Sequence, residues 1–466
     1  MTVRYRSFLG RAREDIERYV SSIEVDRSLA KYAAMVMLAH VENLRIQGLI
    51  PREGADKLAS ILKQVVLSSG RDIYEWIEKE GLTFEDVFEA MEAYLFDRAG
   101  DYAGYVALGR SRNDHVAAAL RLLIRDYVVK LLTELLNLRR ALLEKAVEYE
   151  DTLFVFFTHR QLAQCGSASI YFASYLHTFT VLWRQLLRAL ELLNENPLGS
   201  GPAAGSIVGF VPALASRALC FREVATPPYY ATGSRLFALY PLSIMTLIAA
   251  EVSRFAEDMI FLNSLVPNGV KPPVEHVATS SIMPHKKNLV TLEIVRAKAS
   301  EILGSLVSVV SLYKSLPYGY SLELQEVNSV FIDAANEAID TLRILTDFVK
   351  GLKIDEGELR KLIQGKPCWS SELVEHLAIE KRRPARETYF HIAKLLRDRM
   401  ELGGDVDEVL SMHGLDLEDL VKEKPIEGYM KKLLESHRGL LEADGVQVEK
   451  IAELFDRCTA ELLSKR

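Results

Sequence analysis

The feature of the sequence that most constrains the fold is a hydrophobic repeat within residues 115–147. Its apolar residues follow one another at intervals of four, three, four, three and four, at Ile124, Val128, Leu131, Leu135, Leu138 and Leu142. This spacing is typical of the seam along which one helix packs lengthwise on others. A single helix over this segment would be about 50 Å long.

Four more segments show a similar helical pattern, at residues 169–195, 236–264, 289–316 and 322–352. The alternating patterns that are typical of strands are scarce. We therefore expect an all-α protein whose centre is a bundle of five long helices between about residues 110 and 351.

The predicted long helices are apolar on more than one side. Residues 302–313, for example, include no charged side chain. A helix that is apolar all round has to be buried on several sides, and one chain offers few places to bury five of them. A large monomeric bundle is one solution, and association of subunits around a shared helical core is the other. We favour association.

Breaks in the helical pattern divide the chain into three parts. Residues 196–212 include four glycines and three prolines and cannot form a regular helix. Near residue 352 the pattern changes to shorter amphipathic helices interrupted by Pro367 and Pro384. We expect an N-terminal helical domain over residues 1–108, the long-helix bundle over residues 109–351 and a small helical domain over residues 352–466.

Composition narrows the class of function. The net charge of −7 is mild and argues against binding to nucleic acid or to an acidic membrane surface. The four cysteines form no CxxC motif, so neither a zinc site nor a redox motif is expected, and a reducing cytoplasm fits. The N-terminus lacks the apolar core of a signal peptide. The longest apolar run, residues 236–250, is short for a membrane span and contains Pro241.

Two polar clusters lie just before and just after the segment that is predicted to form the longest helix of the bundle. GRSRND, residues 109–114, precedes that helix, and its two arginines would suit a carboxylate, although Ser111 or Asn113 could simply cap the helix. FFTHRQLAQC, residues 156–165, follows the helix and sets Thr158 and His159 among apolar neighbours. A hydrogen-bonded structural histidine is the simpler interpretation of the second cluster.

A third polar cluster, TSSIMPHKKN, occupies residues 279–288 just before another predicted helix. Lysines near a helix N-terminus are locally unfavourable, because the helix dipole there favours anions. An anion bound between the lysines and the backbone N–H groups would explain their position. A solvated basic turn is the alternative.

Together, SSIMPHKKN, THRQLAQ and GRSRND resemble the three signature regions of the fumarase/aspartase superfamily. Within it, GRSRND, SSIEVD at residues 21–26 and NPLGSG at residues 196–201 are similar to the argininosuccinate lyase family. The resemblance covers nearly the whole chain, and its motifs are several, long and in the family's order. It implies an all-helical subunit of three domains and a homotetramer with five core helices from each subunit. Three different subunits would complete each active site.

The resemblance also implies a reaction without a cofactor, the cleavage of argininosuccinate to arginine and fumarate in arginine biosynthesis. A weakly acidic proton next to a carboxylate has to be removed, so the site needs a base at that carbon and cations or N–H donors at the carboxylate. Ser280 matches the family's catalytic base on a mobile loop, and Lys286 could stabilise its alkoxide. His159 matches a histidine that assists protonation of the leaving nitrogen, and Glu293 matches the carboxylate that pairs with it.

Seven positions match family residues that contact the substrate: Ser22, Arg112, Asn113, Thr158, Asn288, Tyr320 and Gln325. Other positions depart from the family pattern. Thr279 replaces a glycine, Leu289 a proline, Phe88 a histidine and Asn328 a substrate-binding lysine. The change at Asn328 removes a charge that would bind a substrate carboxylate.

Two alternatives accompany the lyase interpretation. A lyase of another succinyl adduct, such as adenylosuccinate, is the nearest enzymatic rival, but GRSRND argues against it. A non-catalytic relative such as the lens protein delta crystallin is the alternative from another class. The retention of Ser280, Lys286, Asn288, His159 and Glu293 together favours an enzyme.

Overall fold

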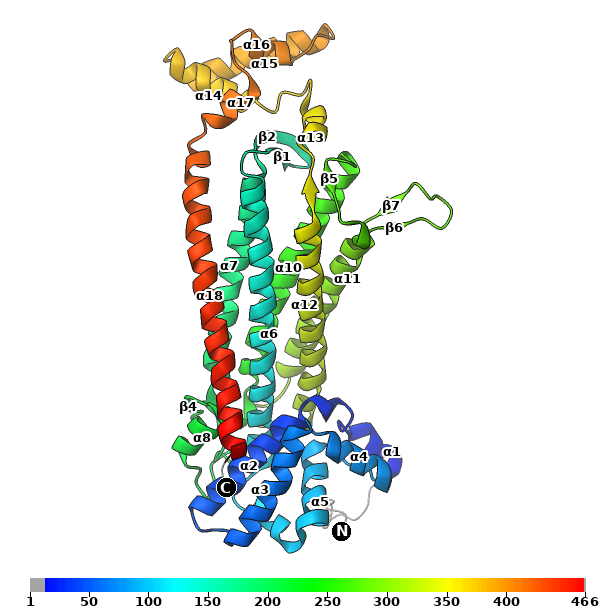
Figure 1. The fold of residues 1–466 in the computed structure, drawn as a ribbon, viewed down its shortest axis with the longest axis vertical. Coiled ribbons are helices and arrows are strands. Elements are labelled where there is room, and N and C mark those ends of the chain that lie inside the picture. The colour runs from blue at the N-terminus through cyan, green and yellow to red at the C-terminus, as the bar shows by residue number, and fades with distance from the viewer. Residues whose placement is uncertain (1–12, 465–466) are drawn as a thin grey trace.

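The computed structural model describes residues 13–464, and most of them are helical, as the sequence predicts. The N-terminal stretch that lacks a signal-peptide pattern begins in residues 1–12, outside the described residues. Five long helices lie side by side as an elongated shaft (Figure 1): α6 (Arg112–Glu148), α7 (Ala168–Leu193), α10 (Leu236–Leu265), α11 (Val290–Tyr313) and α12 (Glu326–Gly351). The predicted bundle of five long helices is therefore confirmed.

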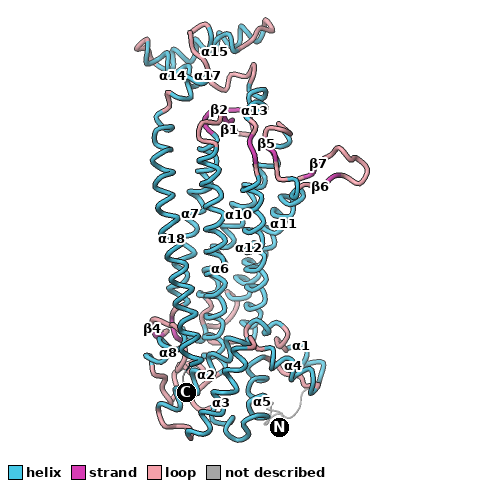
Figure 2. Tube along the Cα trace, viewed as in Figure 1, coloured by secondary structure: helices cyan, strands magenta, loops and turns pink. Residues whose placement is uncertain are grey.

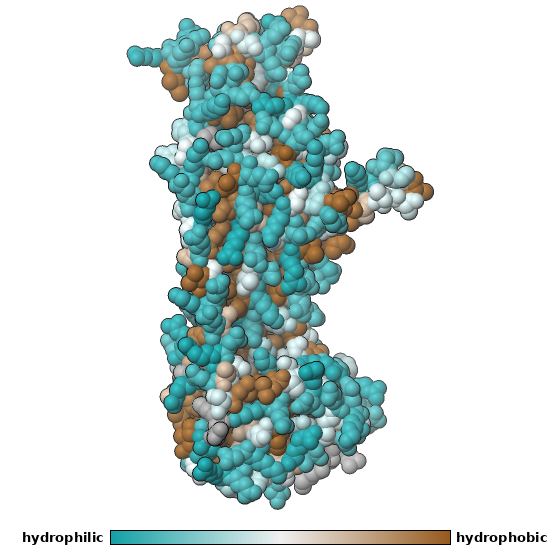
Figure 3. Space-filling view, viewed as in Figure 1, coloured by the Kyte–Doolittle hydropathy of each residue, from teal (hydrophilic) through white to brown (hydrophobic). Residues whose placement is uncertain are grey.

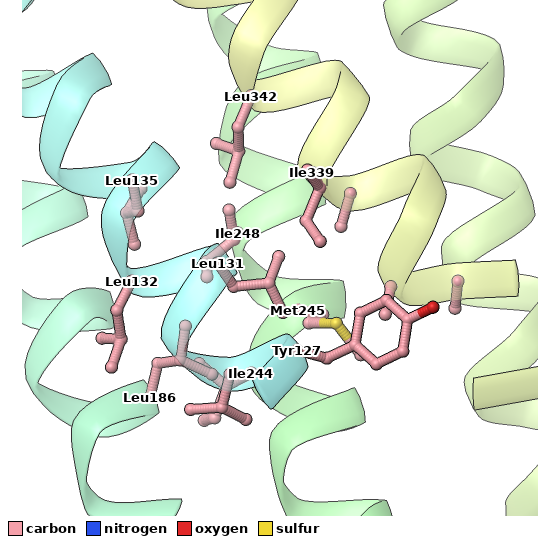
Figure 4. Close-up of a cluster of buried hydrophobic side chains, with 14 of the residues drawn as sticks. Tyr127, Leu131, Leu132, Leu135, Leu186, Ile244, Met245, Ile248, Ile339 and Leu342 are labelled. Atoms are coloured by element: carbon pink, nitrogen blue, oxygen red, sulfur yellow. The ribbon is translucent and has the colours of Figure 1, made fainter. Parts of the chain in front are cut away.

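The hydrophobic seam of α6 lies at the centre of the shaft. All six of its residues, from Ile124 to Leu142, have no exposed surface. Figure 4 shows side chains of four helices meeting around this seam: Tyr127, Leu131, Leu132 and Leu135 of α6, Leu186 of α7, Ile244, Met245 and Ile248 of α10, and Ile339 and Leu342 of α12. Because each buried aliphatic side chain contributes roughly 1.5–3 kcal/mol, this seam fixes how the helices align.

Shorter helices form a unit at one end of the shaft (Figure 1). They are α1 (Glu14–Val20), η1 (Val25–Ser28), α2 (Ala30–Ile46), α3 (Arg52–Leu67), α4 (Arg71–Glu80), α5 (Val87–Ala99) and η2 (Gly100–Ala107). Phe88 is 1% exposed in the core of this unit. The phenylalanine that replaces the family histidine is thus a packing residue in this chain.

Small helices cover the opposite end of the shaft: α13 (Glu356–Ile363), α14 (Ser370–Glu380), α15 (Ala385–Glu401), α16 (Asp407–Ser411) and α17 (Leu417–Lys422). From there α18 (Pro425–Ser464) runs back along the shaft to the N-terminal unit (Figure 1). The division into three domains stays a prediction, and the return of α18 along the bundle is a feature that the sequence pattern did not reveal.

Two buried connections hold α18 against the shaft. Arg139 of α6, with no exposed surface, donates to Asp444 of α18 at 2.7 Å and to Thr180 of α7 at 3.1 Å. A disulfide joins Cys458 of α18 to Cys220, at the end of α8 (Pro212–Leu219). The wide spacing of the cysteines in the sequence therefore gives no support to a reducing cytoplasm, because Cys220 and Cys458 are paired across a sequence separation of 238 residues.

The strands are short and form only two-stranded pairs within residues 13–464 (Figure 2). β1 (Leu153–Thr158) pairs with β2 (Gln161–Ser167) as a hairpin between α6 and α7, and β6 (Ala278–Thr279) pairs with β7 (Lys287–Asn288) before α11. The other two pairs are β3 (Glu195–Asn196) with β4 (Glu223–Val224) and β5 (Val270–Lys271) with β8 (Lys353–Ile354). Helices α9 (Pro228–Gly233), η3 (Val274–His276) and η4 (Leu322–Gln325) complete the connections.

Helix α10 is long and apolar enough to cross a membrane by length and composition. It continues well past the apolar run at residues 236–250 and accommodates Pro241. In the most apolar stretch of α10, 56% is buried inside the chain. The helix packs on α7, α11 and α12. This packing is that of a core helix in a bundle.

Candidate active site

The GRSRND motif forms the start of α6. Ser111 is the N-cap residue and accepts a hydrogen bond from the backbone N–H of Asn113 at 3.2 Å, and Asp114 accepts one from the N–H of Ser111 at 3.0 Å. This reciprocal capping box sets where α6 begins. The capping role considered for Ser111 is therefore confirmed, and the motif has a structural function besides any chemical one.

Arg112, in the first turn of α6, faces two acidic residues of the N-terminal unit. Its guanidinium donates to Glu85 at 2.9 Å and also pairs with Asp86. Burial acts to lower the pKa of Arg112, but Asp86 and Glu85 outweigh it and raise the pKa. Burial raises the pKa of Asp86. Sequence reasoning missed these two carboxylates, which are adjacent in the sequence at residues 85 and 86.

Ser22, Tyr320 and Gln325 gather near the same point. Ser22 is buried and donates to Asp26 at 2.8 Å, and Gln325 donates to the carbonyl of Val20 at 3.3 Å. Burial raises the pKa of Asp26 to about 7. Burial also raises the pKa of Tyr320, while the charges of Arg235 and Arg112 act to lower it. We call Ser22, Arg112, Asn113, Tyr320 and Gln325 the arginine cluster.

A cavity of about 390 Å³ opens beside Ser22 in the N-terminal unit. Carboxylates outnumber cations in its lining, which includes Glu14, Glu17, Glu24, Glu85 and Glu89 but only one arginine. A cavity of this size and charge suits a small ligand with a cationic end.

The glycine-rich segment 196–212 folds over the start of α6. The carboxylate of Asp114 accepts hydrogen bonds from the N–H groups of Gly199 at 3.2 Å and Gly201 at 3.1 Å, and Asn113 donates to the carbonyl of Pro202 at 3.0 Å. Gly199 has a φ of 93°, and a Cβ there would lie 3.0 Å from Phe210. Backbone N–H groups of NPLGSG thus bind the carboxylate of GRSRND that caps α6.

The THRQLAQ motif lies at the tip of the β1–β2 hairpin, not on a helix. The strands are joined by His159 and Arg160 alone, with φ angles of 52° and 59°. Two positive φ values are the signature of a type I′ turn, which normally takes Asn-Gly. Side chains such as these adopt this region at a cost, and such strain is concentrated at functional sites.

Ion pairs connect the tip of the hairpin with the start of α11. Glu257 of α10 lies 3.2 Å from Arg160 on one side and 3.2 Å from Arg296 of α11 on the other. Glu293 is one turn before Arg296 and exposed, as are Thr158 and His159. The predicted pair of His159 and Glu293 forms no hydrogen bond in the described chain, but both residues lie on elements joined through Glu257.

Residues 280–286, which we call the serine loop, connect β6 to β7 and project away from the shaft (Figure 1). Ser280 Oγ accepts hydrogen bonds from the backbone N–H groups of Ile282 at 3.4 Å and Met283 at 3.3 Å. Donors aimed at this oxygen favour its negatively charged form. Lys286 is exposed and forms no ion pair with any residue of 13–464. Asn288 is half-buried at the end of β7.

The predicted site residues are not brought together within one chain. The 37-residue helix α6 separates the arginine cluster from the hairpin that follows it, a distance of about 55 Å. The 24-residue helix α11 separates the serine loop from Tyr320 and Gln325 by about 36 Å. Figure 1 shows the hairpin and the serine loop toward one end of the shaft and the N-terminal unit at the other.

Asn328, which replaces the family lysine, is 5% exposed on α12. Its Oδ1 atom has no hydrogen-bond partner among residues 13–464. Among residues 13–464, no group of three or more His, Cys, Asp or Glu side chains is placed to hold a metal ion.

Comparison with solved structures identifies the fold. EDDS lyase in complex with formate superimposes with a TM-score of 0.79 over 97% of this chain and 95% of that chain, at 21% identity. Residues 11–304 match the family model described as "Lyase". The fold and the sequence therefore define a lyase of the fumarase/aspartase superfamily.

Comparison with curated proteins narrows the family. The argininosuccinate lyase of Pyrococcus furiosus is 33% identical over 463 residues, which is 97% of this chain and 98% of that protein. The argininosuccinate lyase of Pyrobaculum calidifontis is 38% identical over 401 residues, 84% of this chain and 90% of that protein. The chain belongs to the argininosuccinate lyase family.

The strained hairpin turn allows a sharp test of His159. Asparagine tolerates positive φ, so His159→Asn keeps the turn and removes the imidazole. We expect turnover to fall by about 10²–10⁴-fold. Arg160→Asn, at the neighbouring position with a similar positive φ, is the matched control and should stay near the unmodified rate. Equal losses in both variants would assign His159 a structural role in the turn.

The hydrogen bonds to Ser280 generate a second test. Ser280→Ala should lower turnover by about 10²–10⁴-fold while leaving the fold intact, because the loop projects from the core. Ser281→Ala, at the exposed position next to it, should have a much milder effect on the same initial-rate assay. Full activity of Ser280→Ala would remove this residue from the role of base.

Proposed function

We propose that the protein cleaves argininosuccinate to arginine and fumarate by β-elimination, in arginine biosynthesis. One observation carries the proposal. This chain of the argininosuccinate lyase family has all five of the predicted residues at the matching positions of its sequence: Ser280, Lys286, Asn288, His159 and Glu293. The location of such an enzyme would be the cytoplasm.

The serine loop supplies the base. Ser280 Oγ, as an alkoxide, removes the proton from the carbon next to a succinyl carboxylate. The N–H groups of Ile282 and Met283 support the negative charge on that oxygen. Lys286 and Asn288 bind the carboxylate, whose charge grows as the proton leaves, so their attraction is greatest in the transition state.

The hairpin acts on the leaving group. As the carbon–nitrogen bond breaks, its electron pair passes to the guanidino nitrogen and a carbon–carbon double bond forms in fumarate. His159, directly or through water, protonates that nitrogen, and Glu293 orients the imidazole. Thr158, at the end of β1, contributes a hydroxyl that contacts the substrate.

The arginine cluster receives the substrate. The charge of Arg112 is offset by Glu85 and Asp86, so this region is acidic overall and suits the cationic guanidino and amino groups of the arginine end. Ser22, Asn113, Tyr320 and Gln325 add uncharged hydrogen-bonding groups.

The reaction is tested by measuring fumarate release from three substrates at equal concentration. We expect argininosuccinate to be cleaved far faster than adenylosuccinate or aspartate, because its cationic end fits the acidic region beside Ser22. Faster release from adenylosuccinate would contradict the proposed substrate. Release from none of the three would favour the non-catalytic alternative.

Association into a homotetramer is part of the proposal. A site that needs the arginine cluster, the hairpin and the serine loop together has to draw them from different subunits, since α6 and α11 keep them apart. Helix α11 also presents apolar side chains to the outside: Ile294 is 60% exposed, Val307 57% and Leu303 51%. Some hydrophobic residues reach the surface of the shaft beside the projecting serine loop (Figure 3). Exposed apolar side chains on one helix support an interface between subunits there.

Mixing two inactive variants tests whether sites are shared between subunits. Arg112→Ala and Ser280→Ala chains, unfolded together and refolded at equal amounts, should recover about a quarter of the unmodified activity, because random assembly makes that share of sites intact in both groups. Ser280→Ala mixed with Lys286→Ala is the control and should recover none, since one loop carries both residues. No recovery in the first mixture, with tetramers formed, would place all groups of a site in one chain.

A further inference from the structure

All four cysteines of the chain are paired in space, although they lie far apart in the sequence. One pair, Cys220 and Cys458, is a disulfide. In the other pair, the sulfur atoms of Cys165 and Cys368 lie 2.7 Å from each other, although the two residues are 203 positions apart in the sequence. Both side chains are buried, with exposures of 2% and 4%.

We propose that Cys165 and Cys368 form a second, reducible disulfide, which ties the small helices at the end of the shaft to the hairpin that carries His159. A sulfur–sulfur bond is about 2.05 Å long, so the two atoms need to approach by less than about 1 Å. Cys165 lies in β2 opposite Val155 of β1, and Cys368 lies two residues before α14.

Polar contacts around the sulfur atoms hold the two segments in place. Gln164, next to Cys165, donates to Ser371 at 3.2 Å and to Glu372 at 3.1 Å, both at the start of α14. Lys424 donates to the carbonyl of Cys165 at 2.7 Å and pairs with Glu372. These contacts do not involve the sulfur atoms, so they hold the two segments together whether or not the sulfurs are bonded.

The chemistry is thiol–disulfide exchange with a small-molecule disulfide as oxidant. Hydrogen bonding from Cys165 lowers the pKa of Cys368, and the same contact raises the pKa of Cys165. Cys368 is therefore the thiolate that attacks, releasing one thiolate of the oxidant and forming a mixed disulfide. Cys165 then loses its proton, attacks the Cys368 sulfur and releases the second thiolate. The pair loses two electrons, and one oxidant disulfide becomes two thiols.

The opposing interpretation is that the two thiols only pack. Buried cysteine often behaves as a small hydrophobic residue. Counting free thiols distinguishes the two interpretations, and this count does not depend on lyase activity.

The test uses the full chain with Cys220→Ser/Cys458→Ser, which leaves only the inferred pair. The protein is equilibrated with oxidised glutathione or with dithiothreitol, quenched in acid, unfolded and alkylated, and its mass is measured. We expect no alkylation after oxidation and alkylation of both cysteines after reduction, with a peptide cross-link between Cys165 and Cys368 in the oxidised sample. Alkylation of both cysteines after oxidation, or glutathione adducts without a cross-link, would overturn the proposal.

The unmodified chain provides the same answer if that variant fails to fold. Peptide mapping of the oxidised protein should then show two cross-links, Cys220 with Cys458 and Cys165 with Cys368. Finding only the first would overturn the proposal.

The effect of the Cys165–Cys368 bond on unfolding is measured by the rate at which the helical circular dichroism signal is lost at a fixed high temperature. In the Cys220→Ser/Cys458→Ser background, oxidation should slow this loss roughly tenfold, because a bond between distant segments restricts the unfolding chain. Adding Cys368→Ser should abolish the difference between oxidised and reduced samples. Equal rates for the cross-linked and reduced protein would overturn the tie between the small helices and the hairpin.

Discussion

Helix α6 keeps two of the three polar clusters apart for its whole length, because an α-helix cannot shorten without breaking its own hydrogen bonds. The buried seam from Ile124 to Leu142 makes it a rigid element, fixed on several sides by α7, α10, α12 and α18. Every residue before α6 is therefore held far from every residue of the hairpin after it. A chain built in this way places its polar clusters at the ends of long helices.

The packing of the long helices in one chain leaves much of the surface of α11 exposed. Only five of its residues are buried in the chain, and several of its apolar side chains face outward. The same helix follows the serine loop and β7, so a surface suited to association and the loop with the proposed catalytic residues are adjacent. Association and site assembly would then have one physical cause, the burial of the apolar surface of α11.

Local structure at the clusters is consistent with their chemistry. His159 and Arg160 occupy a turn that glycine and asparagine would adopt more easily, and Glu257 holds Arg160 by an ion pair. Ser280 receives two backbone N–H groups on a projecting loop. The bundle supplies rigidity, and the short strand pairs at its edges aim individual side chains.

The helical periods were sufficient to predict an all-α chain and five long helices, because apolar spacing reports which face of a helix is buried. The motifs were sufficient to predict the family and the identity of the candidate residues. The return of α18, the acidic partners of Arg112 and the pairing of the four cysteines could not be predicted in this way. Each depends on contacts between residues far apart in the sequence, such as Arg139 with Asp444 or Cys165 with Cys368. Only the packed chain brings such residues together, since local spacing carries no information about which distant segment will lie alongside.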